Sequence, residues 1–326
     1  MNSWFAWAAL LGIFGTAGAA SLTWERTIPL PGVEGRIDHF AADAAGDRLF
    51  IAALGNDTVE VIDLKAGAIA QSIRGLAEPQ GLCYFATRGR LYVANGRDGA
   101  VRVFDGKTLA PVATVKFDDD ADNLRGDPAT GRLYVGHGDG ALGVIDVASN
   151  QIVADIALPA HPESFQLETN GPRVFVNVPG ARRLAVIDRR RHAVVASWST
   201  GAVAANFPMA LDEPHHRLFV GCRNPARLLV LDTESGAEVA QLELHRDCDD
   251  LFLDARRRRL YASCGEGYLD VFAPSGAGRY AREEAVTTAP GARTCFLDGD
   301  HLYLAVPKRG DTPAAVWCYR AEPASP

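Results

Sequence analysis

Hydrophobic and polar residues alternate along most of this chain, in short runs separated by Gly, Asn and Asp. In residues 90–105, RLYVANGRDGAVRVFD, an apolar run leads into a polar turn, and a second alternating run follows and ends in Asp. Alternation with a period of two on either side of such a turn predicts a β-hairpin. No segment shows the 3.6-residue periodicity of an amphipathic helix.

The hairpin pattern occurs seven times. The other copies are residues 48–63, 132–146, 173–188 and 217–232, with two less regular copies at 259–273 and 301–319. One apolar residue near the start of each copy serves as its marker, in order Leu49, Leu91, Leu133, Val174, Leu218, Leu260 and Leu302. Successive markers are 42, 42, 41, 44, 42 and 42 residues apart, and such regular spacing indicates a repeat architecture.

Two further strand-like runs accompany each hairpin. A short apolar run such as 81–86 precedes the marker, and an alternating run such as 109–117 follows the terminal Asp. Four antiparallel strands in about 42 residues are typical of a β-propeller blade. We therefore predict an all-β, seven-bladed β-propeller with four strands per blade over residues 21–326.

The two ends of the chain predict how the ring closes. Only seven residues follow Tyr319, so the last blade lacks an outer strand, whereas residues 21–30 form a strand-like run with no blade of their own. We expect this N-terminal strand to complete blade seven, which would leave the ring without an open end.

Residues 1–20 have the pattern of a signal peptide. The run from Trp4 to Ile13 is apolar and uncharged, and Ala17-Gly18-Ala19 supplies a small-x-small cleavage pattern. No Lys or Arg precedes the run, so an uncleaved anchor or a wrongly assigned start is the alternative. The run is too short and Gly-broken for a span of about 20 residues. We expect a periplasmic or secreted protein with no membrane span in the mature chain.

Composition and charge narrow the class of protein. With 48% hydrophobic and 22% charged residues, the chain has the composition of a globular protein with a large core. Its net charge of -7 argues against nucleic acid as the main partner. The Arg runs 189–191 and 256–259 fall in turns, and we interpret them as solvated turns rather than a nucleic-acid surface. We expect a monomer.

At YVAN (92–95) and RLYVGHGDGALGVID (132–146) the repeats resemble those of the YVTN-type proteins, the YncE-like seven-bladed propellers. The resemblance covers essentially everything after residue 20. It implies an exported propeller used mainly for binding, with some members associated with DNA, and it supplies no catalytic residues. Blades six and seven depart from the pattern, because Ala273 replaces the hairpin-ending Asp and residues 307–313 form a long loop.

Candidate binding residues lie where the innermost strand of each blade begins, at the face of a propeller that usually binds ligands. We call it the mouth face. Residues ten and eleven positions before each marker are unusually polar there, and Arg293 enters the set because the turn of blade seven is two residues shorter. The predicted ligand-binding residues are Asp38, His39, Gln80, Asp122, Asn123, Glu163, Phe207, Asp249, Asp250 and Arg293.

This set predicts an acidic channel mouth that attracts cations. Asn123, Glu163 and Asp250 supply oxygen atoms that could hold a divalent cation, Ca²⁺ or similar. The alternative is a ring of solvated loop acids that bond to nearby turns. His39 is the only imidazole and Arg293 the only guanidinium in these two columns, and a lone imidazole beside acids is more often structural than catalytic.

One cysteine pair could form a disulfide. Antiparallel register that pairs Leu253 with Leu260 places Cys248 almost opposite Cys264, so a cross-strand bridge is geometrically feasible in an oxidising compartment. Cys83, Cys295 and Cys318 fall inside strand-like runs and are expected to be buried.

Two functions remain open. The first is a non-catalytic binding or scaffold protein that takes a small molecule or a protein at the mouth face; no catalytic residue and no nucleophile motif is assigned. The second is a metal-dependent hydrolase resembling the gluconolactonase-type propellers, which hold a divalent ion with Glu, Asn and Asp. Fold analogy alone is a weak argument for the second.

Overall fold

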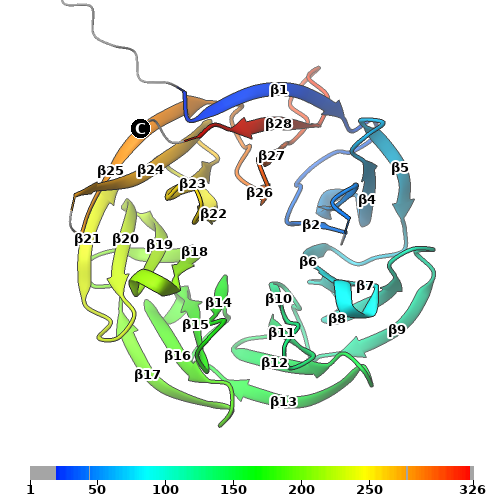
Figure 1. Cartoon of the computed structure of the whole chain (residues 1–326). Coiled ribbons are helices and arrows are strands. Elements are labelled where there is room, and N and C mark those ends of the chain that lie inside the picture. Colours follow the sequence, from blue (N-terminus) through cyan, green and yellow to red (C-terminus); the bar gives the residue numbers. More distant parts are fainter. Residues whose placement is uncertain (1–19, 44, 277, 324–326) are drawn as a thin grey trace, which may run out of the picture.

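Seven four-stranded antiparallel sheets surround a central channel in the computed structural model, which describes residues 20–43, 45–276 and 278–323 (Figure 1). The predicted propeller is thereby confirmed. The predicted signal peptide, residues 1–20, lies almost entirely outside the described residues. Within the described part of the chain, no helix is long and apolar enough to cross a membrane.

The first three blades share one strand order, from the channel outward. Blade one contains β2 (Phe40–Ala42), β3 (Arg48–Ala53), β4 (Thr58–Asp63) and β5 (Ala68–Ile73). Blade two contains β6 (Pro79–Phe85), β7 (Arg90–Asn95), β8 (Ala100–Asp105) and β9 (Pro111–Lys116). Blade three contains β10 (Leu124–Asp127), β11 (Arg132–His137), β12 (Ala141–Asp146) and β13 (Gln151–Ala157).

Blades four to six repeat this order. Blade four contains β14 (Phe165–Leu167), β15 (Arg173–Val178), β16 (Arg183–Asp188) and β17 (Ala193–Ser199). Blade five contains β18 (Ala204–Asp212), β19 (Arg217–Asn224), β20 (Ala226–Asp232) and β21 (Glu238–Glu243). Blade six contains β22 (Cys248–Asp254), β23 (Arg259–Cys264), β24 (Tyr268–Gly276) and β25 (Arg279–Thr287). The short 3₁₀ turns are η1 (Leu54–Asn56), η2 (Ala86–Arg88), η3 (Pro179–Ala181) and η4 (Glu213–His215).

Blade seven is built from both ends of the chain. Its strands are β26 (Cys295–Asp298), β27 (His301–Val306), β28 (Ala315–Ala321) and, outermost, β1 (Leu22–Pro29). Figure 1 shows β1 in blue beside β28 in red at the outside of the ring. Leu22 pairs with Ala321 and Pro29 with Ala315, which confirms the predicted closure by the N-terminal strand.

Apolar packing between neighbouring blades holds the ring together. Every marker residue is at most 2% exposed. Between blades two and three, for example, Phe85 and Tyr92 pack in one cluster with Leu133 and Val135. Each fully buried side chain of this size contributes about 1.5–3 kcal/mol from loss of water contact. The alternating pattern of the repeats therefore encodes both the strands and the contacts between blades.

The Asp that ends the third strand of a blade organises the turn that follows it. Asp105 accepts the backbone N–H groups of Lys107 and Thr108, at 3.1 and 2.9 Å. It also pairs with Arg90 at the start of the second strand. Asp146, Asp188 and Asp232 accept equivalent backbone bonds in blades three to five. These turns lie on the face opposite the mouth face, which we call the turn face.

Blade six lacks this Asp and its outer hairpin is longer. With Ala273 in the place of Asp, β24 continues to Gly276 and β25 begins at Arg279, so that each strand has nine residues. An alanine side chain cannot accept backbone N–H groups, so it does not close the turn at this point. The hairpin therefore extends beyond the neighbouring blades on the turn face.

Candidate functional site

Equivalent backbone bonds place the predicted mouth residues at the same height in the ring. The N–H groups of Asp38, Asp122 and Glu163 donate to the carbonyls of Ala52, Gly136 and Asn177, at 2.8, 2.9 and 2.9 Å. In blades two, five and six, strand pairing is irregular at this level, between Pro79 and Leu82, Asn206 and Met209, and Cys248 and Asp250. Bulges of this kind commonly re-aim side chains beside functional sites.

His39 joins the carboxylates of blades one and six. Its Nε2 lies 3.6 Å from Asp38 Oδ1 and its Nδ1 lies 3.4 Å from Asp250 Oδ1. Burial alone would lower the pKa of His39, but the charges of Asp38 and Asp250 outweigh it and raise the pKa to about 10. Burial also raises the pKa of Asp38, although Arg36 donates to its Oδ2 at 2.9 Å. His39 is therefore held as a cation between two carboxylates in this part of the mouth.

A second ionic network crosses from blade five to blade seven. Arg223 pairs with Asp249, and Arg293 contacts Asp249 Oδ2 at 2.9 Å and Asp247 Oδ1 at 3.0 Å. The Arg223 guanidinium lies 4.0 Å from the centre of the Phe207 ring, within cation–π distance. The mouth therefore contains more positive charge than the two columns predicted, because Arg36 and Arg223 join Arg293.

Blades three and four contribute a compact group of possible metal ligands. One ligand atom each from Asp122, His161 and Glu163 lies within 4.8 Å of the others. His161 Nδ1 is 2.6 Å from the Gly138 carbonyl oxygen, and His161 Nε2 is 3.8 Å from Asp122 Oδ2. A carbonyl only accepts hydrogen bonds, so Nδ1 carries the proton and Nε2 faces the carboxylates.

Asp122, His161 and Glu163 shift one another's pKa values. Burial and the charge of Asp122 raise the pKa of Glu163 to about 8. Burial would lower the pKa of His161, but its bond to Asp122 raises it to about 9. Burial would likewise raise the pKa of Asp122, yet His161 and His39 hold it below its usual value. Mutual raising of pKa values, expected for crowded acids, therefore occurs at Glu163 but not at Asp122.

The predicted metal set Asn123, Glu163 and Asp250 differs from this group. Asp250 accepts the backbone N–H of Cys295 at 2.9 Å and faces His39, so it is engaged elsewhere. Asn123 stays close, because its Nδ2 lies 3.3 Å from Asp122 Oδ2. The Asn123 side chain is 2% exposed and its Oδ1 has no partner among the described residues.

His161, Asp247 and Arg36 were missed because they belong to a third column, thirteen residues before the markers. Side chains two residues apart in an extended segment point to the same side, which is the signal that could have found them. The same column holds Asp120, whose Oδ1 accepts from Gln80 Nε2 at 3.2 Å. That bond places the predicted Gln80 in the mouth as well.

Beneath the mouth, the channel contains a cavity of about 430 Å³. His39 and Asp250 line its upper part, and Arg125, Gln166 and Cys83 line it from inner strands. Cys83 is therefore partly exposed to the channel, contrary to the expectation of burial, whereas Cys295 and Cys318 are buried. Charged side chains thus continue from the mouth into the channel.

The cysteine pair has the predicted register. Cys248 lies directly across from Cys264 in the pairing of β22 with β23, and both side chains are buried. Both are free thiols in the structure. The disulfide remains a prediction for the protein in an oxidising compartment.

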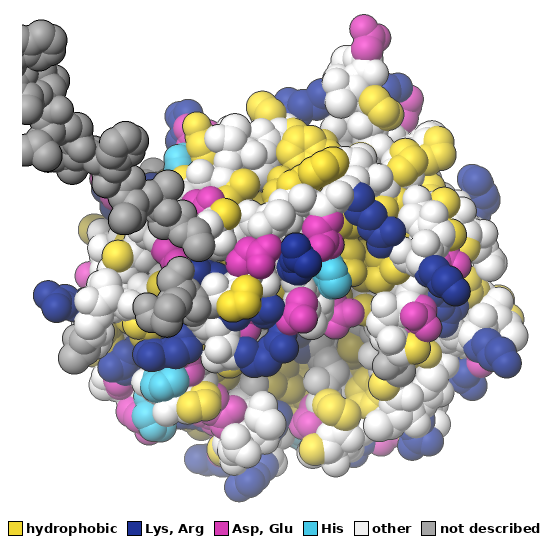
Figure 2. Space-filling view, turned by 45° about the horizontal axis from the view of Figure 1, so that its top comes forward, with side chains coloured by type: hydrophobic (Ala, Val, Ile, Leu, Met, Phe, Trp, Pro, Cys, Tyr) yellow, Lys and Arg dark blue, Asp and Glu magenta, His cyan; other side chains and the backbone are white. Residues whose placement is uncertain are grey.

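The Arg runs form ion pairs in the turns. Arg189 contacts Asp127 at 3.2 Å, and Arg256 and Arg257 both contact Asp300. Arg259 is 1% exposed, so its interpretation as part of a solvated turn was wrong. On the side of the molecule shown in Figure 2, Lys and Arg side chains are scattered among Asp and Glu and form no continuous basic band.

The closed ring and its charged channel mouth define the class of protein as a seven-bladed β-propeller, and the sequence is similar to that of YncE proteins. The chain is 26% identical over 239 residues to the "Uncharacterized protein YncE" of Salmonella typhimurium, covering 68% of this chain and 67% of that protein. The Salmonella typhi protein of the same name matches to the same extent. No protein-family model matches the chain. The resemblance indicated by the repeats is confirmed.

Solved structures agree on the fold. A chain of Kuenenia stuttgartiensis hydrazine synthase superposes with a TM-score of 0.75 at 17% identity, over 85% of this chain and 95% of that chain. The WD40 repeats of RRP9 superpose with a TM-score of 0.79 at 11% identity, over 94% and 98% of the two chains. At such identities the likeness shows the propeller fold alone.

Proposed function

We propose that the protein is a non-catalytic binding protein that takes its ligand or protein partner at the mouth face, and that a divalent metal ion forms part of this site. The setting we propose is the periplasm or the outside of the cell. The observation that carries the metal proposal is the group formed by Asp122, His161 and Glu163. Titratable groups with perturbed pKa values that converge in a channel mouth are typical of functional sites.

His161 has the orientation of a metal ligand. Its Nδ1–H donates to the Gly138 carbonyl at 2.6 Å, and this bond fixes the ring and leaves Nε2 as the coordinating atom. Backbone or carboxylate partners of this kind accompany most metal-binding histidines. A metal ion would replace the proton that His161 otherwise shares with Asp122, so binding should release protons.

Asn123 supplies a further oxygen. Its Oδ1 is buried and has no partner among the residues that the structure describes, while its Nδ2 lies against Asp122. A buried acceptor without a donor costs about 1–3 kcal/mol. A cation beside Asp122 would compensate this cost, since the amide could turn its oxygen toward the ion.

The ligand types favour Zn²⁺ or Mn²⁺ over the Ca²⁺ expected from oxygen atoms alone. Imidazole suits zinc and its neighbours, and carboxylate suits manganese. Ligand atoms on one zinc ion lie at most about 4 Å apart, twice the bond length of roughly 2.0–2.2 Å. The present separation of up to 4.8 Å therefore requires only a small inward movement of the three side chains.

Metal titration of chelator-treated protein tests the proposal. Calorimetry with Zn²⁺, Mn²⁺, Ca²⁺ and Mg²⁺ should find one tight site for Zn²⁺ or Mn²⁺, and a hundredfold excess over Kd should stabilise the fold by about 2.7 kcal/mol. His161→Gln and Glu163→Gln should abolish both effects. Asp118→Asn, which removes an exposed acid from the neighbouring loop, is the matched control and should bind normally.

Two results would overturn the metal site. One is the absence of heat and of thermal stabilisation with all four ions, and the other is equal binding by the His161→Gln variant. The binding role of the mouth face would then rest on the channel and its ionic networks alone.

Metal-dependent hydrolysis is the second candidate function. If Asn123 keeps its bond to Asp122, the three ligands Asp122, His161 and Glu163 leave an open coordination position, which is the arrangement of catalytic rather than structural zinc sites. His161 and Glu163 are partly exposed, so the open position would face the mouth. Hydrolysis of γ- and δ-lactones by metal-loaded protein, lost in Glu163→Gln, would favour this function. No turnover by metal-loaded protein would favour the binding role.

A further inference from the structure

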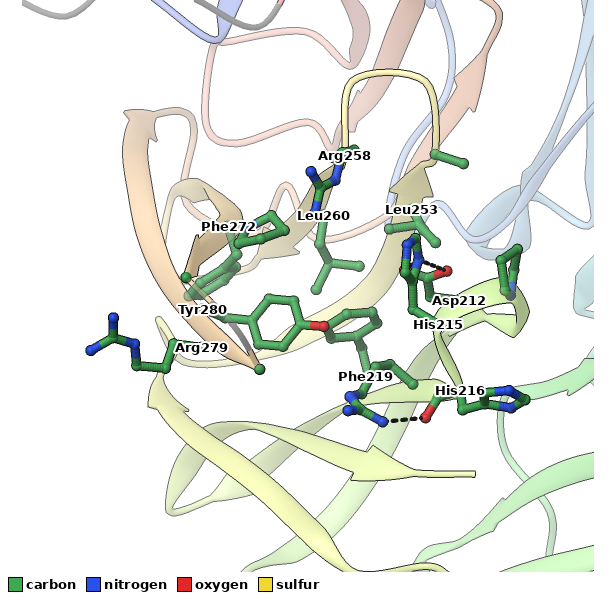
Figure 3. A pocket seen from close by; sticks show the side chains of 16 residues that line it. Asp212, His215, His216, Phe219, Leu253, Arg258, Leu260, Phe272, Arg279 and Tyr280 are labelled. Atoms are coloured by element: carbon green, nitrogen blue, oxygen red, sulfur yellow. Dashed lines mark hydrogen bonds and ion pairs between the residues drawn. The ribbon is translucent and has the colours of Figure 1, made fainter. Parts of the chain in front are cut away.

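A separate pocket lies on the turn face, between blades five and six (Figure 3). It has a volume of about 550 Å³, within the roughly 300–1,000 Å³ of typical small-molecule sites. Its walls come from η4, from the turn between β22 and β23, and from the extended β24–β25 hairpin. None of the mouth residues takes part in it.

The walls of the pocket are largely apolar. Phe219 and Leu253 come from blades five and six, and Leu260 and Phe272 complete the apolar surface. Tyr280 packs edge to face on Phe219 with ring centres 5.2 Å apart. Phe219, Leu260 and Phe272 are at most 2% exposed, so Leu253 and the Tyr280 ring offer most of the accessible apolar surface. An apolar ligand body gains here mainly by leaving water itself.

The pocket also contains arginine side chains and the hydroxyl group of Tyr280. Figure 3 shows the Tyr280 hydroxyl pointing into the middle of the pocket, toward Phe219, and Arg258 at the rim, whereas Arg279 points away. Burial raises the pKa of Tyr280, the Arg217 and Arg258 guanidiniums lower it, and the Asp212 carboxylate adds to the rise. Two cations and one carboxylate therefore lie near the hydroxyl.

The charges are not balanced within the pocket. Arg217 contacts Asp232 at 2.9 Å, and Asp212 contacts His215 at 2.8 Å. Arg258 forms no ion pair and no side-chain hydrogen bond with any described residue. The pocket therefore presents an unpaired guanidinium and a phenol hydroxyl above an apolar floor, a combination that matches an anionic head on an apolar body.

We propose that this pocket binds a small carboxylic acid with an aromatic or branched aliphatic body. The carboxylate accepts hydrogen bonds from Arg258 and the Tyr280 hydroxyl, with Arg217 as a further positive charge. The body lies against Leu253 and the Tyr280 ring, above the buried Phe219 and Phe272. The long outer hairpin of blade six, which follows from Ala273, provides one wall of the site.

Binding of 4-phenylbutyrate, measured by calorimetry in the presence of a chelator, tests this site. The neutral amide 4-phenylbutyramide and the cation 4-phenylbutylamine have the same body, and each should bind at least about tenfold more weakly, the loss expected for a charge-assisted hydrogen bond. Arg258→Gln should weaken 4-phenylbutyrate about tenfold or more, and Tyr280→Phe a few-fold. The exposed Arg258 side chain has no partner within the described part of the chain, so its variant should melt like the parent.

Controls separate this site from the mouth. Arg88→Gln removes an exposed arginine from the corresponding turn of blade two and should leave binding unchanged. His161→Gln should also leave it unchanged, because that residue belongs to the other face. Equal affinity for the amide and the carboxylate, unchanged affinity in Arg258→Gln, or no binding of 4-phenylbutyrate at millimolar concentration would each overturn the proposal.

Discussion

Carboxylates on the two faces of this ring behave in opposite ways. Asp105, on the turn face, accepts backbone N–H groups from Thr108 and Lys107, and these bonds lower its pKa to about 2. On the mouth face, burial and the charge of Asp122 raise the pKa of Glu163 to about 8. The first arrangement favours the ionised side chain in the folded protein and the second disfavours it. Groups whose ionisation opposes folding are expected at functional sites rather than in the supporting frame.

We use the word frame for the strands and turns that support the ring outside the mouth. Breaking an ion pair within this frame should have the largest effect on stability. Arg259 is 1% exposed and donates to both carboxylate oxygens of Glu283, at 2.8 and 2.6 Å, and to the Glu322 carbonyl. Arg259→Ala removes these bonds next to the closing blade. Urea unfolding should show a loss of about 2–3 kcal/mol, the upper part of the range for hydrogen bonds to a charged group, because Arg259 is buried while Glu283 is partly exposed.

The control for this prediction is Arg190→Ala, an exposed arginine whose side chain has no ion pair or hydrogen bond with the described residues and whose backbone N–H donates to Asp188. It should change stability by less than about 0.5 kcal/mol. Equal stability of the Arg259→Ala and Arg190→Ala variants would show that Arg259 is not part of the frame.

A turn carboxylate should have a moderate effect. Asp146→Ala removes the acceptor for Ala148 N–H and Ser149 N–H, both at 2.9 Å, and should cost about 1–2 kcal/mol at pH 7. The pKa of Asp146 is lowered in the fold, chiefly by the Ser149 N–H. Its contribution is therefore present above the unfolded pKa near 4 and lost as pH falls through the folded pKa.

Stability of the Asp146→Ala variant should accordingly approach that of the parent in acid. Asp139→Ala, an exposed acid in the nearby hairpin loop, provides the comparison and should match the parent at every pH. A constant deficit for Asp146→Ala from pH 7 down to pH 2 would contradict the assigned role.

The repeat pattern predicted most of the frame and only part of the mouth. Strand alternation and turn residues recur in every blade, so each of the seven imperfect copies supports the assignment of the others. The closing role of residues 21–30 also followed, because blade seven was one strand short. Columns aligned on a marker found Asp122 and Glu163. They missed His161, which lies in a third column two residues before Glu163. Its contact with the Gly138 carbonyl of the preceding blade is visible only in the folded loop. Contacts between blades depend on loop conformations that single-sequence spacing does not encode.

Blade six also shows what the sequence alone does not predict. Ala273 was visible as a departure from the repeat, but its consequence required the fold. Loss of the turn carboxylate lengthens the hairpin, and the length brings Tyr280 over Phe219 in the neighbouring blade. The presence of Ala273 predicted only that blade six is irregular. The structure shows in addition that its longer hairpin forms one wall of a pocket.

The mouth should give the smallest change in stability and the opposite dependence on pH. The folded pKa of Glu163 lies above its unfolded value, so its protonated form contributes stability that is present below about pH 4.5 and lost as pH rises toward 8. Glu163→Gln should remove this contribution. As pH rises from 5 to 8, the free energy of unfolding of the variant should increase relative to that of the parent by on the order of 1 kcal/mol.

Chemical denaturation of both proteins in chelator at several pH values measures this gain. Part of the dependence should persist in the variant, because His161 and His39 also have raised pKa values and lose stabilising charge as pH rises. Parallel curves for parent and variant across this range would show that Glu163 ionises freely in the folded protein.

The antiparallel pairing of β1 with β28 also determines how the ring responds to mechanical force. Leu22 and Ala321 are partners, so the two ends of the folded chain leave the same end of the same pair of strands. Tension applied between the ends therefore loads the interstrand hydrogen bonds one after another, as in a zipper, instead of all at once in shear. The ring should peel open at blade seven under low force, while the six blades formed from contiguous sequence are still folded.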